Sequence, residues 1–172
     1  MEEDGRSLAQ PREGNVAVVD LSHEFDAFYE AITLGKKQNG RIDSAFESLQ
    51  TFLCEQYDVD RGAVFVQGSC ANGTAVVPAD PEVGEYDVDT VLVLPDGDVS
   101  SNEALDDLRT TLKGSKRYAS RITTRKPCIR LQYADDEIGG FHVDVVPVRA
   151  APISGDAPLE APRRNEGWHE TA

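Results

Sequence analysis

Three aspartates lie inside two hydrophobic segments of the sequence. Asp87 and Asp89 alternate with other residues in segment 86–94, and Asp144 lies in the middle of segment 141–148. Residues two apart in a strand project from the same face of a sheet, so Asp87 and Asp89 should point the same way. If the two segments form neighbouring strands, the three carboxylates converge and repel one another, and divalent cations relieve that repulsion because they bind oxygen ligands. Three carboxylates can hold two magnesium ions about 3.5–4 Å apart, the arrangement used in phosphoryl transfer.

A turn of small residues upstream of these aspartates is suited to holding phosphate. Gly68 and Ser69 directly follow Gln67, which ends a short β-branched segment. Glycine lets backbone N–H groups approach a phosphate closely, and the serine hydroxyl adds a donor. Thr74 either contacts the nucleotide or caps a short helix, and the sequence leaves these alternatives open.

Three more polar residues near these motifs have competing interpretations. Arg130 could pair with a phosphate, but in so acidic a chain a structural ion pair is favoured. His142 is expected to pack within its strand, because magnesium prefers oxygen ligands. Cys70 has no basic neighbour in the sequence that would make it a nucleophile.

The elements that must position these residues follow from periodicity. A capping box, Ser100-x-x-Glu103, precedes one of the helices. Apolar residues three and four apart predict helices, and β-branched runs predict strands, the one at 117–124 being the weakest. The helices are expected at 21–34, 40–57 and 101–113, and the strands at 63–67, 86–94, 117–124, 127–133 and 141–148. Two helices followed by a mixed central sheet flanked by helices make an α+β fold.

Length and charge narrow the class of protein. The chain has 172 residues and a net charge of −14, which indicates one domain and excludes a generic binder of nucleic acid or of anionic membranes. No stretch of 18 apolar residues predicts a transmembrane helix, and the acidic N-terminus is unlike a signal peptide. The three cysteines are widely spaced, which favours a reduced, cytoplasmic protein without a zinc site or a disulfide framework.

In their order and context, these motifs resemble those of the polymerase-β-like nucleotidyltransferases. The resemblance rests on the Gln-Gly-Ser turn with Thr74, the Glu-Tyr-Asp-Val-Asp strand and Val143-Asp144-Val145-Val146-Pro147. Within that superfamily the chain is most similar to the bacterial cyclic-oligonucleotide synthases (CD-NTases), relatives of cyclic GMP-AMP synthase and oligoadenylate synthase. The similarity covers roughly residues 20–172.

This resemblance implies an activity and a role for each motif residue. The enzyme would join nucleoside triphosphates into a cyclic oligonucleotide second messenger by attack of a ribose hydroxyl on an α-phosphate, with release of pyrophosphate. Asp87 and Asp89 would hold two Mg²⁺ or Mn²⁺ ions, and Asp144 would hold one of them and help to deprotonate the hydroxyl. Ser69, with Gly68 and Thr74, would contact the triphosphate, and Gln67 would lie near the nucleotide.

The resemblance also implies partners and a domain plan. A role in bacterial anti-phage defence, an effector that responds to the product and a regulatory protein partner are expected, and long nucleic acid is not. The expected plan is a flexible arm over 1–18, a nucleotidyltransferase core over 19–150, and a Pro-rich tail over 151–172 with no element of its own, leading toward a missing C-terminal helical domain. The alternatives are a minimal nucleotidyltransferase, of the antitoxin or protein-modifying type, and a catalytically silent nucleotide-binding module.

Overall fold

The computed structural model describes residues 19–78, 84–95, 98–125, 127–133, 139–150 and 158–171. The predicted arm over 1–18 lies outside the described residues. The chain divides into two compact units, residues 1–31 and 32–172. The first unit carries most of helix α1 (Ser22–Ile32), which confirms the first predicted helix, and its Phe25 and Phe28 side chains are exposed.

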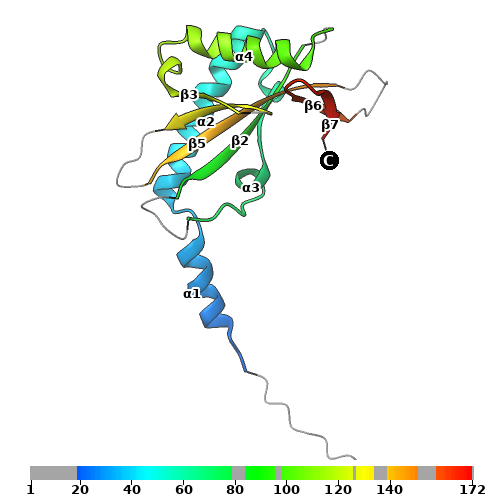
Figure 1. The fold of residues 1–172 in the computed structure, drawn as a ribbon. Coiled ribbons are helices and arrows are strands. Elements are labelled where there is room, and N and C mark those ends of the chain that lie inside the picture. The colour runs from blue at the N-terminus through cyan, green and yellow to red at the C-terminus, as the bar shows by residue number, and fades with distance from the viewer. Residues whose placement is uncertain are drawn as a thin grey trace, which may run out of the picture. The chain divides into compact units, whose positions relative to one another are not determined.

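The second unit is built on a mixed sheet with the strand order β1-β2-β5-β4-β3 (Figure 1). Strands β2 and β5 are parallel, whereas the other neighbouring pairs along this path are antiparallel. A parallel pair needs a crossover connection, and helix α4 (Ser101–Gly114) lies in the segment that links β2 to β5. The α+β prediction with a mixed sheet is therefore confirmed. The strand bounds are β1 Val64–Gln67, β2 Tyr86–Val93, β3 Ile122–Thr124, β4 Ile129–Tyr133 and β5 Phe141–Ala150.

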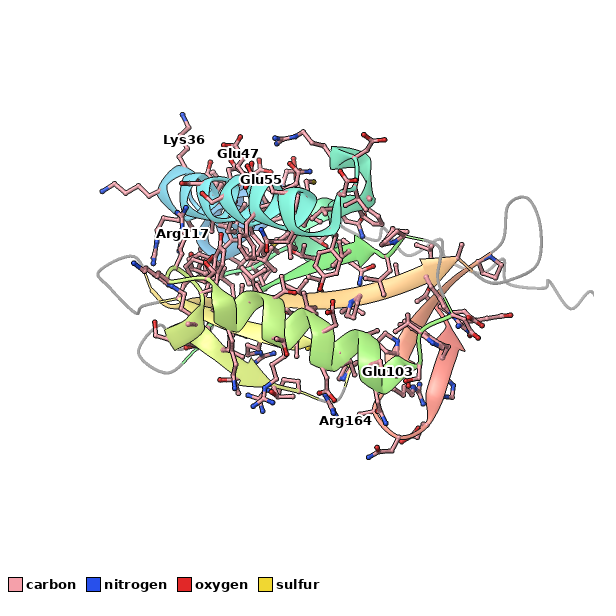
Figure 2. The ribbon with its side chains drawn as sticks, turned by 90° about the horizontal axis from the view of Figure 1, so that it is seen from above. Lys36, Glu47, Glu55, Glu103, Arg117 and Arg164 are labelled. Atoms are coloured by element: carbon pink, nitrogen blue, oxygen red, sulfur yellow. The ribbon has the colours of Figure 1, made fainter. Side chains whose placement is uncertain are left out.

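Helices α2 (Lys36–Tyr57) and α4 cover one face of this sheet. Leu53 of α2 and Leu108 of α4 are fully buried, in one cluster with Val88 and Val143 of the two central strands. Lys36, Glu47 and Glu55 point outward from α2 (Figure 2). Among the described residues, no helix is long and apolar enough to cross a membrane.

The two core helices begin at side-chain caps. The Gln38 side-chain oxygen accepts a 2.6 Å hydrogen bond from the Gly35 N–H, which fixes the start of α2 at Lys36, earlier than the predicted residue 40. The predicted capping box of α4 is confirmed, since the Ser100 hydroxyl accepts from the Glu103 N–H at 3.3 Å and the Ser100 N–H donates to the Glu103 carboxylate at 2.9 Å. Capping satisfies N–H groups that lack an intrahelical partner.

The C-terminal segment forms a hairpin, and the expectation that it has no element of its own was wrong. Strands β6 (Leu159–Arg163) and β7 (Gly167–Glu170) pair with each other, and β6 also pairs with β5. Pro162 lies opposite Trp168 in the β6–β7 pair, beyond the two residues of β6 that pair with β5.

Side chains tie this hairpin to α4. The Trp168 indole donates to the Val99 carbonyl at 2.9 Å, two residues before α4 begins. Arg164, which is labelled in Figure 2, donates to Asp106 of α4 at 2.8 Å. Tertiary contacts therefore stabilise a Pro-rich segment whose composition predicted a tail.

Candidate active site

One row of polar side chains crosses four strands on the face opposite α2 and α4. Gln67 of β1 lies opposite Asp89 of β2, Asp89 lies opposite Asp144 of β5, and Asp144 lies opposite Arg130 of β4. Directly opposed residues of neighbouring strands project from the same face. The two aspartate strands are therefore neighbours, and the sheet register places Asp89 and Asp144 side by side. Asp87 lies on this same face, two residues from Asp89.

Asp144 is held by Arg130. The guanidinium donates from Nε to Oδ1 and from Nη2 to Oδ2, each at 2.7 Å, and the two side chains are only 22% and 13% exposed. Burial raises the pKa of Asp144, but the hydrogen bonds and charge of Arg130 outweigh this, and the pKa is lowered overall. The ion-pair interpretation of Arg130 is thus confirmed.

Asp89 has the opposite electrostatic environment. Its pKa is raised, first by burial and then by the negative charges of Asp87 and Asp144. Asp87 itself is exposed. The convergence of carboxylates expected from the sequence is therefore present, and it contributes to the raised pKa of Asp89.

The predicted phosphate turn forms a short helix, α3 (Gly68–Ala71), that lies beside β2 (Figure 1). Gly68 has a φ of +68°, and a Cβ atom at this position would lie 2.6 Å from Asp89 Oδ2. Only glycine fits both this left-handed backbone and this close approach. The turn is thus packed directly against the row of carboxylates, with Ser69 as its second residue.

Thr74 closes the loop that follows α3. Its N–H donates to the Ser69 carbonyl at 2.9 Å, and its hydroxyl also faces that oxygen at 3.5 Å. These bonds satisfy a carbonyl at the C-terminal end of the short helix α3, so the capping alternative is supported. Contact of Thr74 with a nucleotide stays a prediction.

Two cysteines lie close to aspartates of the site, Cys70 near Asp87 and Cys128 near Asp144. The Cys70 thiol donates to the Asp87 carbonyl at 3.4 Å, and burial, followed by the charges of Asp87 and Asp89, raises its pKa. Burial, with the charge of Asp144, raises the pKa of Cys128 to about 12. Both thiols therefore stay protonated near neutral pH, which fits the expectation that Cys70 is not a nucleophile.

The sequence patterns did not predict a second polar cluster, which lies beside Asp87. His142 lies opposite both Asp87 and Gln132, and Glu85 accepts a hydrogen bond from Gln132 and lies 3.2 Å from His142 Nδ1. The Gln132 hydrogen bond is the main cause of the lowered pKa of Glu85. His142 is buried within its strand, as expected. The period-two spacing of His142 from Asp144 was the signal that places it on the polar face.

The residues of the row fit divalent cations in chemistry, and two of the three aspartates also fit in arrangement. Carboxylate oxygens are suitable donors, and the raised pKa of Asp89 reflects a repulsion that a cation would relieve. Asp87 and Asp89 could hold a metal ion, whereas both oxygens of Asp144 are bonded to Arg130. Over the described parts of the chain, no group of three or more His, Cys, Asp or Glu residues is arranged to hold one.

Residues 19–172 match the family model of the Second Messenger Oligonucleotide or Dinucleotide Synthetase domain, SMODS. No curated protein matches the chain.

Several solved structures share the fold. The CD-NTase CdnG of Bradyrhizobium diazoefficiens, in complex with GTP, has a TM-score of 0.65 and 23% identity over 82% of this chain and 40% of that one. CdnC of Escherichia coli MS115-1, in complex with HORMA-deltaN, has a TM-score of 0.57 and 19% identity over 87% and 46%. The Vibrio cholerae cyclic AMP-GMP synthase DncV has a TM-score of 0.60 and 13% identity over 88% and 57%. The chain thus spans about half the length of these proteins.

Proposed function

The chain belongs to the Second Messenger Oligonucleotide or Dinucleotide Synthetase domain family, with the polymerase-β-like fold of the bacterial CD-NTases, and from this premise we propose that it is the catalytic core of an enzyme that makes a cyclic oligonucleotide. One observation carries the proposal. A Cβ atom on Gly68 would lie only 2.6 Å from Asp89 Oδ2, and this close packing supports a site in which the turn and the carboxylates act on the same triphosphate. A triphosphate on the turn would thereby have its reacting end at the row of aspartates.

Each residue of the row and of the turn has its own role in the proposed reaction. The Ser69 hydroxyl and the N–H groups of the turn bind the donor triphosphate, with Gln67 and Thr74 beside it. Asp144 orients the attacking ribose hydroxyl and accepts its proton, while the new bond to the α-phosphate forms and the bond to pyrophosphate breaks. Asp87 and Asp89 would hold two Mg²⁺ or Mn²⁺ ions, one of them shared with Asp144, and these ions would supply the positive charge that stabilises the transition state.

The proposal extends to partners and to the rest of the catalytic unit. Nucleoside triphosphates are the substrates, and the product acts on a downstream effector in bacterial anti-phage defence, within the cytoplasm. Because CdnC was solved with a HORMA partner, a regulatory protein is a reasonable partner for this chain too. Residues 19–150 would form the core, 1–18 a flexible arm, and 151–172 the connection to a helical domain that completes the nucleotide cleft.

A catalytically silent nucleotide-binding module is the second candidate. This candidate is favoured by the ion pair in which Arg130 donates hydrogen bonds to both oxygens of Asp144, the third carboxylate of the site. This candidate predicts nucleotide binding without formation of a product.

The first experiment is calorimetric binding of ATP, GTP, CTP and UTP with Mg²⁺. The wild-type chain is compared with Asp87→Asn/Asp89→Asn, and Glu47→Gln/Glu55→Gln on the outer side of α2 serves as a control with the same change in charge away from the row (Figure 2). Loss of the two carboxylates should weaken binding of the Mg²⁺-bound triphosphate by about a hundredfold or more, because these side chains would hold the Mg²⁺ beside the phosphates. Equal binding by the wild type and the double variant would contradict the assignment.

Incubation with labelled triphosphates then separates the candidate functions. Release of a cyclic product by the chain, alone or extended at its C-terminus, would support the synthase. A labelled protein would favour the protein-modifying alternative, and metal-dependent binding without any product would favour the silent module.

A further inference from the structure

The proposed mechanism gives Asp144 two tasks, yet the structure gives this side chain a different partner. Its two carboxylate oxygens accept hydrogen bonds from two nitrogens of one guanidinium, both at 2.7 Å. Forked arginine–carboxylate pairs are the strong, geometrically specific kind. While both bonds are made, a cation or a proton can reach Asp144 only at the remaining lone pair of each oxygen, and a cation does so against the positive charge of the guanidinium.

The environment of the pair makes it more than a surface ion pair. The Arg130 and Asp144 side chains are 22% and 13% exposed, and the two residues are directly opposed in the register of β4 and β5. Solvent therefore screens the pair only in part, and the two strands hold both backbones at a fixed spacing. Asp89, on the other side of Asp144, has no comparable cation in register, since it lies opposite Gln67 and Asp144.

We propose that Arg130 is a latch on Asp144, a positioning residue that keeps the third carboxylate out of the metal-binding set until at least one of its two hydrogen bonds is released. This inference rests on the proposed function, because a latch is meaningful only if Asp87 and Asp89 bind cations. Phosphate oxygens are strong acceptors for arginine. A triphosphate bound on the turn beside Asp89, and extended along the row, is therefore the chemical group that would replace Asp144 as the partner of Arg130 and so couple substrate binding to completion of the site.

The test measures binding of Mn²⁺ alone to the full 172-residue chain, from the loss of the free-ion electron paramagnetic resonance signal. Arg130→Met removes the guanidinium, and Mn²⁺ should bind about tenfold more tightly because Asp144 is released and a positive charge is lost. Arg130→Lys keeps the charge but cannot bond both oxygens in the forked geometry, so it should still tighten binding by about threefold. In an Asp144→Asn background, Arg130→Met should tighten binding by no more than about twofold, because only the loss of a positive charge remains and no carboxylate is released.

Arg149→Met is the matched control. Arg149 makes a cross-strand pair with Glu160 at 2.8 Å, with side chains 26% and 16% exposed, but it lies outside the row of carboxylates. Its replacement should leave the affinity for Mn²⁺ within about twofold of wild type. Circular dichroism on each variant establishes that it is folded, and Arg130→Lys keeps the test decisive if Arg130→Met does not fold.

Two results would overturn the latch. One is an Arg130→Lys chain that binds Mn²⁺ like wild type, and the other is a gain from Arg130→Met that is equally large without Asp144. Either result would mean that Arg130 affects Mn²⁺ binding only through its charge. Binding that depends on Asp87 but not on Arg130 would reject the latch and leave the proposed function standing. Binding unaffected by Asp87→Asn, or absent from every variant, would reject the metal site and the latch together.

Discussion

The face of the sheet that α2 and α4 cover and the opposite face are made by alternate residues of the same strands. On the covered face, Val88 and Val143 are fully buried in the cluster that includes Leu108. On the opposite face, their neighbours Asp89 and Asp144 form the polar row. Stability and chemistry are thus assigned to different faces, one residue apart along each strand. Single substitutions on the two faces should therefore separate the free energy of unfolding from ligand binding.

The largest expected effect is a loss of unfolding free energy on substitution in the face covered by α2 and α4. Leu108→Ala leaves a cavity at a fully buried position, and it should lower the free energy of unfolding by about 2–5 kcal/mol. Urea titration measures this loss. The folded fraction should bind nucleotide with unchanged affinity, because Leu108 faces away from the row; a tenfold weaker affinity would show that the faces are not independent.

A smaller effect is expected where the turn meets the polar face. Gly68→Ala places a methyl group 2.6 Å from Asp89 Oδ2 at a φ of +68°, so the turn or Asp89 must move. The left-handed backbone alone should cost about 1–2 kcal/mol in unfolding free energy. Displacement of the carboxylate should in addition weaken binding of ATP with Mg²⁺ by about tenfold, measured by calorimetry.

Gly73→Ala is the control for this position. Gly73 has nearly the same φ, +67°, but a Cβ there meets nothing within 4 Å. Gly73→Ala should therefore lower the free energy of unfolding about as much as Gly68→Ala does, but leave the affinity for nucleotide unchanged. Equal loss of affinity in both variants would assign the effect to backbone strain instead of to the contact with Asp89.

The smallest expected effect concerns two carboxylates of the polar face whose pKa values are shifted in opposite directions, Asp89 upward and Asp144 downward. The folded pKa of Asp89 is raised, so its ionisation destabilises the fold at pH 7, and Asp89→Asn should stabilise the metal-free chain by about 1 kcal/mol or less. The gain should disappear as the pH falls below the usual aspartate value of 3.8, where the group is protonated in both states.

Asp144 should behave in the reverse way. Its folded pKa is lowered, so it stabilises the fold above 3.8 and this contribution is lost as the pH falls. Asp144→Asn should therefore destabilise the chain at pH 7. Thermal unfolding of both variants between pH 3 and 7, with chelator present, measures the two signs, and a destabilising Asp89→Asn would contradict the asymmetry.

Much of the fold could be predicted because local patterns and tertiary contacts agree. The stripe of α4 and its capping box act within one helix, and the alternation in 86–94 gives the two faces of β2 directly. The C-terminal hairpin could not be predicted in this way. Its strands are short and lie in a segment rich in proline, and they depend on β5, on Asp106 and on the Val99 carbonyl, all distant in the sequence.

The sequence by itself determined which residues carry chemistry and on which side of their own strands they lie, because residue type and the period of two are local properties. The tertiary structure alone decided which strands are neighbours. The register between β2 and β5 sets Asp89 beside Asp144, and the register between β4 and β5 sets Arg130 on the other side of Asp144. Residues 130 and 144 meet because a hairpin aligns them, and no local pattern specifies whether a carboxylate in such a row faces a metal ion or an arginine.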